Sequence, residues 1–229
     1  QAIRTARNKG IQILFGGAEL LDDFSALMKK TENRKNIHLR GKDYYQKLLD
    51  TYPEHSYITL SSIDLKARLE NLQAQLTKTL KEAEKFTEKT KPGKIENNQQ
   101  EQKRLQEEID FLQDKISQGA TVVPLSGTLV LEYGKTSENI YAGMDEGYRR
   151  YQPAIITWYE TAKHAFERGA DWQNMGGIEN DLKGGLYSFK SKFNPTIEEF
   201  AGEFNLPTNP LYHLSNLAYT LRKKLRSKH

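Results

Sequence analysis

The feature that most constrains the fold is a polar segment from Asp64 to about Gln118, whose few apolar residues recur at helical intervals. The segment holds one proline and one glycine, and most of its other residues favour helices. Two apolar stripes alternate between intervals of three and four, the a/d pattern by which two helices pack along a narrow seam. The first stripe comprises Leu65, Leu69, Leu72 and Leu76 and is continued by Ala83 and Phe86; the second comprises Leu105, Ile109, Leu112 and Ile116.

A break separates the two stripes. The sequence KTKPGK at 89–94 has a Pro-Gly dipeptide at its centre, which is typical of a turn. Each stripe is long enough to pair with the other, so we predict an antiparallel coiled-coil hairpin over residues 63–119. Acidic and basic residues nearly cancel along this arm. The plain interpretation is a structural spacer or a dimerisation arm, because a/d seams are packing devices.

The sequence on either side of the arm alternates between strand and helix patterns. We predict strands at 11–15, 56–60, 121–134, 139–141 and 171–175, and helices at 19–30, 41–52, 148–168 and from 211 onward. These elements make an α+β body into which the arm is inserted. We divide the chain into a first part of the body at 1–62, the arm at 63–119, a second part of the body at 120–206 and a basic C-terminal helix at 207–229.

Composition excludes several kinds of chemistry. The chain has no cysteine, which removes disulfides, thiolate metal ligands and thiol nucleophiles and fits a reducing compartment. Its five histidines are scattered and none is spaced with another as metal ligands are, so we expect no metal site. No run of about 18 apolar residues is available to span a membrane. The glycine-rich stretches match neither a P-loop nor a dinucleotide-binding fingerprint.

Two clusters carry functional interest. In the first, Arg40 and Tyr44 lie four residues apart, so a helix that begins between them would point both toward one site. A guanidinium and a phenol both donate hydrogen bonds, as a phosphate or carboxylate ligand requires; the plain alternative is a surface loop beside a core tyrosine. The second cluster is GGIENDLKGGLYSFKSKFNP at 176–195. There the pattern alone favours a glycine-rich turn before a helix end, with Phe189 and Phe193 packed on one face.

Basic residues gather at both ends of the chain, which carries a net charge of +4. The first group runs from Arg4 to Lys9, and the second is RKKLRSK at 222–228. Such groups suggest a polyanionic partner such as nucleic acid or anionic lipid. They suit equally well the solvated end of a helix, where the dipole favours cations.

Taken in order, these motifs resemble one enzyme family. They are TxxRK at 31–35, RxxxY at 40–44, the arm, PLSGTLVLEYG at 124–134, YRRYQPAIITWY at 148–159, a strand ending in Gly-Gly, and GLYSFKSKFNP at 185–195. The ordered set resembles the Fem family of tRNA-dependent aminoacyl transferases, which extend the stem peptide of the peptidoglycan precursor in Gram-positive bacteria. The resemblance covers nearly the whole chain and is closest to the streptococcal MurM and MurN type, which adds serine or alanine.

The resemblance implies a fold and an origin for the chain. The body would be a GNAT-like (acyl-CoA N-acyltransferase-like) domain that carries the arm. The chain would be a fragment that lacks the family's N-terminal domain, an expectation to which its start at Gln1 without an initiator methionine also points.

The resemblance also implies roles for particular residues. A Phe-Lys pair that stabilises the oxyanion of the transfer reaction matches Phe189 and Lys190, with Lys192 as the alternative in a shifted register. The arginine and tyrosine that hold the precursor's phosphates match Arg40 and Tyr44 by their spacing, and Tyr141 is implied to line the same cavity.

The implied donor substrate is an aminoacyl-tRNA and the implied acceptor is a lipid-linked peptidoglycan precursor, with no cofactor. The enzyme would be cytoplasmic, with peripheral association at the inner face of the plasma membrane. The basic residues Lys192, Arg222, Lys223 and Lys224 are candidate tRNA contacts. Two interpretations of other classes remain open, a non-catalytic coiled-coil scaffold and a tRNA-binding module.

Overall fold

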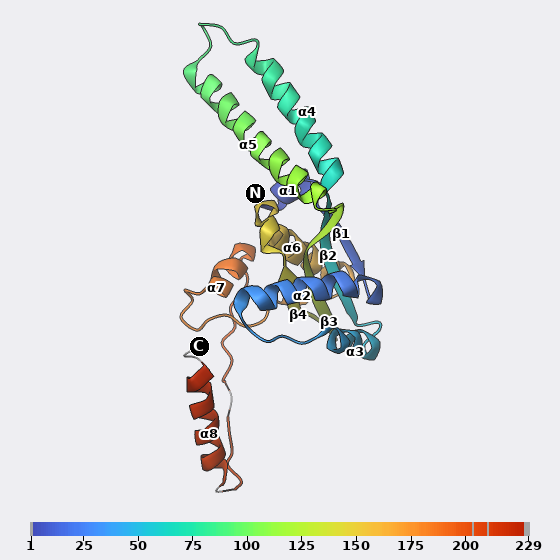
Figure 1. The fold of residues 1–229 in the computed structure, drawn as a ribbon. Helices are drawn as coiled ribbons and strands as arrows, with labels where there is room; N and C mark the ends of the chain where they lie inside the picture. The colour runs from blue at the N-terminus through green and yellow to red at the C-terminus, as the bar shows by residue number, and fades with distance from the viewer. Residues whose placement is uncertain (1, 203, 210, 227–229) are drawn as a thin grey trace. The chain divides into compact units, whose positions relative to one another are not determined.

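The computed structural model describes residues 2–202, 204–209 and 211–226, and the description of side chains ends at Arg222. The chain forms two compact units, 1–189 and 190–229. The first unit contains a five-stranded sheet in the order β1 (Gln12–Gly16), β2 (Ser56–Asp64), β3 (Val122–Tyr133), β4 (Thr136–Met144) and β5 (Trp172–Asn174) (Figure 1). The first four strands pair antiparallel, and β5 pairs parallel with β4. The fold is therefore mixed α+β, as the sequence predicts.

Alternation along β2 divides its side chains between two helical layers, because successive residues of a strand point to opposite faces of the sheet. Ile58 and Leu60 pack in a core with α2 (Leu21–Lys35) and α3 (Lys42–Thr51). Ser61 points the other way, where its hydroxyl accepts a hydrogen bond of 2.8 Å from Thr157 of α6 (Pro153–Glu167). The α2 and α6 helices thus cover opposite faces of the sheet, and Figure 1 shows α2 crossing the strands.

The arm consists of α4 (Leu65–Ala83) and α5 (Pro92–Ser117), which lie side by side in Figure 1. The Asp64 carboxylate begins α4 by accepting backbone N–H bonds from Lys66 and Ala67, at 2.9 and 3.0 Å. Such an N-cap satisfies two of the amides that a helix start leaves unpaired. The Asn98 side chain donates to the Thr79 carbonyl at 3.0 Å, which ties the start of one helix to the end of the other. The two helices are therefore antiparallel.

The base of the arm is continuous with the core of the body. Leu65, Leu72, Leu105 and Leu112 are fully buried in one cluster with residues of the sheet, of α1 (Ala2–Asn8) and of the segment before α6. Burying side chains of this size stabilises a fold by about 1.5–3 kcal/mol each. The apolar stripes predicted from the sequence thus have two uses, because they pack the helices together and also join them to the body.

Prolines shift two of the predicted boundaries. The turn of the arm was placed on the Pro-Gly dipeptide, but Pro92 is the first residue of α5, and Phe86 lies in the turn after α4 has ended at Ala83. The helix predicted at 148–168 is two helices, the 3-10 helix η2 (Glu146–Tyr151) and α6, separated by Gln152 at a left-handed φ of 56°. A proline disfavours helical geometry in the residue before it, yet fits the first turn of a helix, so each proline starts a helix.

Other predicted elements are present with different lengths. The strand predicted at 56–60 continues to Asp64, and the short strand predicted at 139–141 is β4, Thr136–Met144. The helix predicted at 19–30 begins with a 3-10 turn, η1 (Ala18–Leu20), and continues as α2.

The second unit is described by itself. It contains the 3-10 helix η3 (Ser191–Phe193) and α8 (Leu211–Arg226), the C-terminal helix that the sequence predicts from Leu211. The short helix α7 (Gly185–Lys190) ends where this unit begins. The compact units thus divide between Phe189 and Lys190, whereas the sequence-based division lies at 206/207.

Candidate functional site

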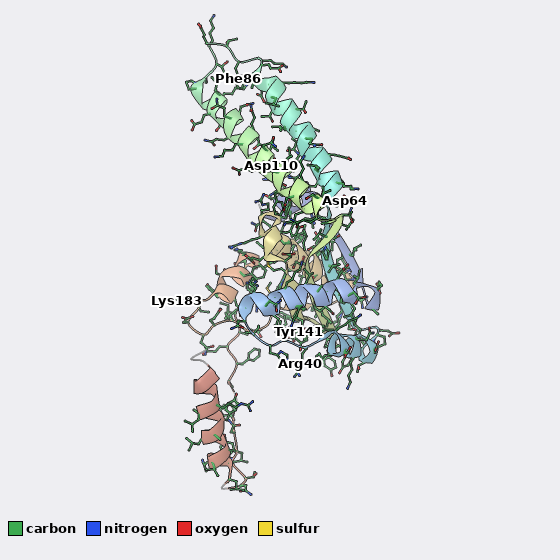
Figure 2. All side chains as sticks on the ribbon, in the orientation of Figure 1. Arg40, Asp64, Phe86, Asp110, Tyr141 and Lys183 are labelled. Atoms are coloured by element: carbon green, nitrogen blue, oxygen red, sulfur yellow. The ribbon has the colours of Figure 1, made fainter. Side chains whose placement is uncertain are left out.

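Arg40, Tyr44 and Tyr141 come together in the structure. Arg40 precedes α3, and its guanidinium carbon lies 5.1 Å from the ring centroid of Tyr44 in the first turn of that helix. The Tyr44 ring meets the ring of Tyr141, on β4, edge-on at 6.2 Å between centroids. Figure 2 places Arg40 and Tyr141 at the end of the body that is remote from the arm. The predicted spacing of Arg40 and Tyr44 therefore makes a pair of hydrogen-bond donors, to which the sheet adds a third.

The phenol of Tyr141 is held in its protonated form. Burial raises its pKa above the ordinary value of 10, and the neighbouring Tyr44 raises it further, while the Arg40 guanidinium acts in the opposite direction. A protonated phenol donates a hydrogen bond, as an anionic ligand needs. The three side chains thus present donors without a competing negative charge of their own.

A cavity of about 260 Å³ lies beside this group, between α2 and the chain that leads into α3. Its lining residues are Ser25, Lys29, Glu32, His38, Leu39, Arg40, Gly41, Lys42 and Tyr45. Two of them bring buried hydroxyls. Among the described residues, neither Ser25 Oγ nor Tyr45 Oη has a hydrogen-bond partner. Buried polar atoms are normally paired, so these two hydroxyls are positions at which a ligand would complete the bonding.

The cavity wall is mostly cationic. Its cations are Lys29, Arg40 and Lys42, and its one acidic lining residue is Glu32, whose carboxylate lies 3.3 Å from both the Lys29 ammonium and the His38 Nδ1 atom. The Lys42 ammonium pairs with Asp22, which is not among the lining residues. Burial raises the pKa of Tyr45 to about 12, so this phenol too is a donor at neutral pH. A cavity with this lining suits a phosphate or carboxylate group, because the cations attract it and the phenol and guanidinium donate to it.

The predicted Phe-Lys pair lies on α7. The ring of Phe189 packs edge-to-face on Trp158 of α6, at 5.3 Å between centroids. Lys190 is the last residue of the helix and only 7 % of it is exposed. Buried lysines are uncommon and reduce the cost of desolvation by partnering other groups, so a lysine at this position is a functional candidate.

The remaining predicted site residues differ in exposure. Lys192, in η3, and Arg222, in α8, are exposed. The backbone of Lys223 and Lys224 belongs to α8, and their side chains lie outside the described residues. Their assignment as tRNA contacts stays a prediction.

Two further properties concern the described residues as a whole. No three His, Asp or Glu side chains in this part of the chain converge as ligands of a metal ion would. No helix within it combines the length and the apolar character needed to cross a membrane.

Comparison with known proteins shows where the chain belongs. The model of the FemAB family matches residues 1–220. This chain is a member of the FemAB family.

Similar curated proteins are lipid II:glycine glycyltransferases of staphylococci. That of Staphylococcus epidermidis is 28 % identical over 227 residues, which cover 93 % of this chain and 54 % of the relative. That of Staphylococcus aureus is 26 % identical over 234 residues, with the same coverage of 93 % and 54 %. The chain therefore spans about half the length of the curated relatives it matches. A crystal structure of FemX matches the fold with a TM-score of 0.58 and 22 % identity, over 83 % of this chain and 51 % of that one.

Sequence reasoning missed several residues of this candidate site. The sequence offers one signal for Tyr45, namely its position beside Tyr44 on a helix, where neighbours point in different directions. It offers none for Ser25, which reaches the cavity only because α2 packs beside the chain leading into α3. It also gives no direct signal for Glu179, whose carboxylate binds backbone amides of α7.

Proposed function

We propose that this FemAB chain is part of an aminoacyl transferase. The enzyme moves serine or alanine from an aminoacyl-tRNA to the stem-peptide lysine of a lipid-linked peptidoglycan precursor and so builds the interpeptide bridge. The observation that carries the proposal is the match of the family across residues 1–220, together with similar proteins named for glycine transfer to lipid II. Those relatives are named for the transfer of glycine, so the choice of serine or alanine rests on the sequence resemblance alone.

The proposed fold class is GNAT-like. It is supported by a sheet whose first four strands are antiparallel and whose last pair, β4 and β5, is parallel, with helices on both faces. The β4–β5 pairing stops after Glu138 and Asn174, so the rest of β4 continues beyond its neighbour. That part of β4 pairs with β3 alone and carries Tyr141 opposite Leu129, and it therefore contributes to the candidate site.

The cavity beside Arg40 would hold the phosphates of the acceptor. Arg40 offers a planar fork of donors to phosphate oxygens, and Tyr44 and Tyr141 add phenol donors. The neighbouring Lys29 and Lys42 supply positive charge around the same cavity. The role of this group is binding, because none of these residues is required to exchange protons with the reacting atoms.

The reaction itself needs no enzyme nucleophile. The lysine amine of the acceptor attacks the ester carbonyl carbon of the donor, so that a C–N bond forms and a tetrahedral oxyanion appears. When the intermediate collapses, the C–O bond to the ribose breaks and the proton lost by the amine ends on the departing ribose hydroxyl. The enzyme contributes by aligning the reactants and stabilising the oxyanion, which together account for most of such accelerations.

Lys190 would provide that stabilisation. Its ammonium group is a compact positive charge, and its burial strengthens electrostatic interactions by excluding water. Phe189 would hold the helix against Trp158, so that the lysine emerges from a fixed segment. No cofactor takes part in this scheme, since the donor is already activated as an ester.

The arm tip offers a surface for the tRNA. A cavity of about 680 Å³ near the turn of the arm is lined by Lys78, Lys81, Lys85 and Lys94, with Glu82 and the ring of Phe86 among them. Ammonium groups beside an aromatic ring suit the phosphates and bases of RNA. For an acceptor with a lipid tail, we place the enzyme in the cytoplasm, in peripheral contact with the inner face of the plasma membrane.

The test is a transfer assay on the gene product that contains this chain. Radiolabelled serine, alanine or glycine on tRNA is incubated with lipid-linked precursor, and the product is separated by chromatography. We expect Lys190→Ala to lower kcat about 100-fold or more, the cost of losing an oxyanion donor. Lys183→Ala removes an exposed lysine just before the same helix and is the matched control, with kcat unchanged. Full activity of Lys190→Ala would show that Lys190 does not stabilise the oxyanion.

A second variant separates binding from chemistry. Arg40→Lys keeps the charge and loses the planar fork, so we expect KM for the precursor to rise about tenfold, with kcat unchanged. An unchanged KM would show that the precursor's phosphates do not bind in this cavity.

A further inference from the structure

The loop before α7 is closed by one acidic side chain. The two carboxylate oxygens of Glu179 accept hydrogen bonds from the backbone N–H groups of Leu186 and Tyr187, at 3.1 and 3.0 Å. These are the second and third residues of α7, whose amides have no partner inside the helix. A capping residue normally sits directly before the helix. Here the carboxylate arrives from seven and eight residues upstream.

Gly184, directly before α7, makes room for this arrangement. A Cβ built at Gly184 would lie 2.0 Å from Cδ and 2.3 Å from Oε1 of Glu179. A side chain at position 184 and the Glu179 carboxylate thus compete for one place. Gly185 differs, because a Cβ built there meets nothing within 4 Å. The first glycine of the pair is therefore required by the carboxylate, and the second is not.

Further contacts hold both ends of the segment. The Leu182 amide donates to the Glu179 carbonyl at 3.2 Å, which tightens the loop that carries the carboxylate. At the far end of the helix, Phe189 packs on Trp158 of α6. A helix of six residues has too few internal hydrogen bonds to be stable alone. Contacts outside the helix therefore set its orientation, and the Glu179 carboxylate at one end and the Phe189 ring at the other are two of them.

We propose that Glu179 is a positioning residue. It caps α7 in place of the side chain that Gly184 lacks, and so fixes the direction in which the side chains of Phe189 and Lys190 project from that helix. The catalytic part of this inference rests on the proposed function of Lys190, and the capping part does not. Glu179 itself touches no reacting atom in the scheme above. Its effect is to keep the pair aligned between turnovers.

The capping part is tested on the present chain by hydrogen exchange of the Leu186 and Tyr187 amides, followed by NMR. Glu179→Ala and Gly184→Ala should each speed exchange at these two amides at least tenfold, because the carboxylate is removed or displaced. Gly185→Ala is the matched control and should leave both rates within twofold of the wild type. Unchanged exchange in Glu179→Ala would overturn the cap.

Combining the variants makes the test sharper. Once Glu179 is alanine, position 184 has no carboxylate to displace, so adding Gly184→Ala should cause no further increase in exchange. Contacting residues show such non-additivity, whereas independent sites add. Additive effects would mean that Gly184→Ala acts through the backbone and would refute the competition for space.

The positioning part is tested in the transfer assay on the gene product that contains this chain. We expect Glu179→Ala and Gly184→Ala to lower kcat roughly 10- to 100-fold through misalignment, with KM for the precursor unchanged. Glu179→Gln keeps one acceptor oxygen and should recover part of the loss, while Gly185→Ala should match the wild type. If the amides exchange faster while kcat is unaffected, Glu179 is a cap without a positioning role. A wild type inactive with every charged tRNA would refute the proposed function and the positioning role that rests on it, and leave the cap to the exchange result.

Discussion

Replacing Arg68 by methionine should destabilise the body strongly, because it leaves a buried charge in the base of the arm without its main partner. Arg68 and Glu108 join α4 to α5, and their side chains are only 5 % and 4 % exposed. The guanidinium Nε and Nη2 atoms lie 2.9 and 2.8 Å from the same carboxylate oxygen, Oε1. Breaking such a pair from one side costs about 3–5 kcal/mol, since the remaining ion stays out of water.

The surroundings of Glu108 place the expected value within that range. Its other oxygen lies 3.6 Å from Nη1 of Arg104, a half-exposed side chain that also binds Glu101 at 2.6 Å. Arg104 would compensate only in part, because its charge is shared and solvated. We therefore expect a loss of about 3 kcal/mol, a large part of the roughly 5–15 kcal/mol by which domains are stable.

Urea unfolding followed by circular dichroism measures this loss. With a denaturant dependence of about 2 kcal/mol per molar urea, 3 kcal/mol lowers the unfolding midpoint by about 1.5 M. Arg104→Met removes the exposed neighbour and should cost less than about 1 kcal/mol. The double variant Arg68→Met with Glu108→Leu removes both buried charges and should recover most of the midpoint.

Two results would refute this reasoning. A midpoint shift in Arg68→Met no larger than that of Arg104→Met would show that the pair is solvated. A double variant no more stable than the single one would show that the loss comes from packing around the arginine stem, with no contribution from the unpaired carboxylate.

Two further perturbations follow from the same packing. Gly143→Ala would place a Cβ 2.9 Å from the backbone carbon of Leu27, so α2 would have to move away from β4. The free energy of unfolding, measured by urea titration, should therefore fall by about 1–3 kcal/mol. Gly93→Ala is the control: its Cβ meets nothing within 4 Å in the first turn of α5, so the free energy of unfolding should stay unchanged or rise slightly. Burial lowers the pKa of His164, whose ring stacks on Phe15 at 4.0 Å, below its ordinary value of 6.5. The unfolded chain therefore binds the proton first, and stability should decline as the pH falls below 6.5 toward the lowered folded pKa. The drop in melting temperature from pH 7.5 to pH 5.5 should be smaller in His164→Phe, and an equal drop in both proteins would contradict this assignment.

Periodicity predicted the elements of this fold well because it depends on local geometry. The alternation of Ile58 and Leu60 with Ser61 marks a strand with two different faces. The structure covers one face with the apolar side of α2 and the other with α6, whose Thr157 hydroxyl bonds to Ser61. Boundaries were harder to predict at Pro92 and Pro153. A proline can end one helix or begin another, and only the cap and the packing of the segment that follows decide which.

The candidate site divides along the same line between local and distant contacts. Arg40 and Tyr44 meet because four residues separate them at the start of one helix, and that much is visible in the sequence. Tyr141 joins them across about 100 positions of chain, through a strand register that no local pattern specifies. The buried hydroxyls of Ser25 and Tyr45 acquire their meaning only from the cavity they share.

The glycines at 184 and 185 show why a motif can be present in a sequence and still not be interpretable. Taken as a pair they signal a turn, and nothing in their spacing distinguishes one from the other. The structure separates them by a single neighbour, since a Cβ at Gly184 would occupy the place of the Glu179 carboxylate and a Cβ at Gly185 would meet solvent. The cap of α7 is thus encoded by an acidic residue and by the absence of a side chain five positions later. Glu179 and Gly184 each look like ordinary loop residues, and together they determine where α7, the helix with Phe189 and Lys190, begins.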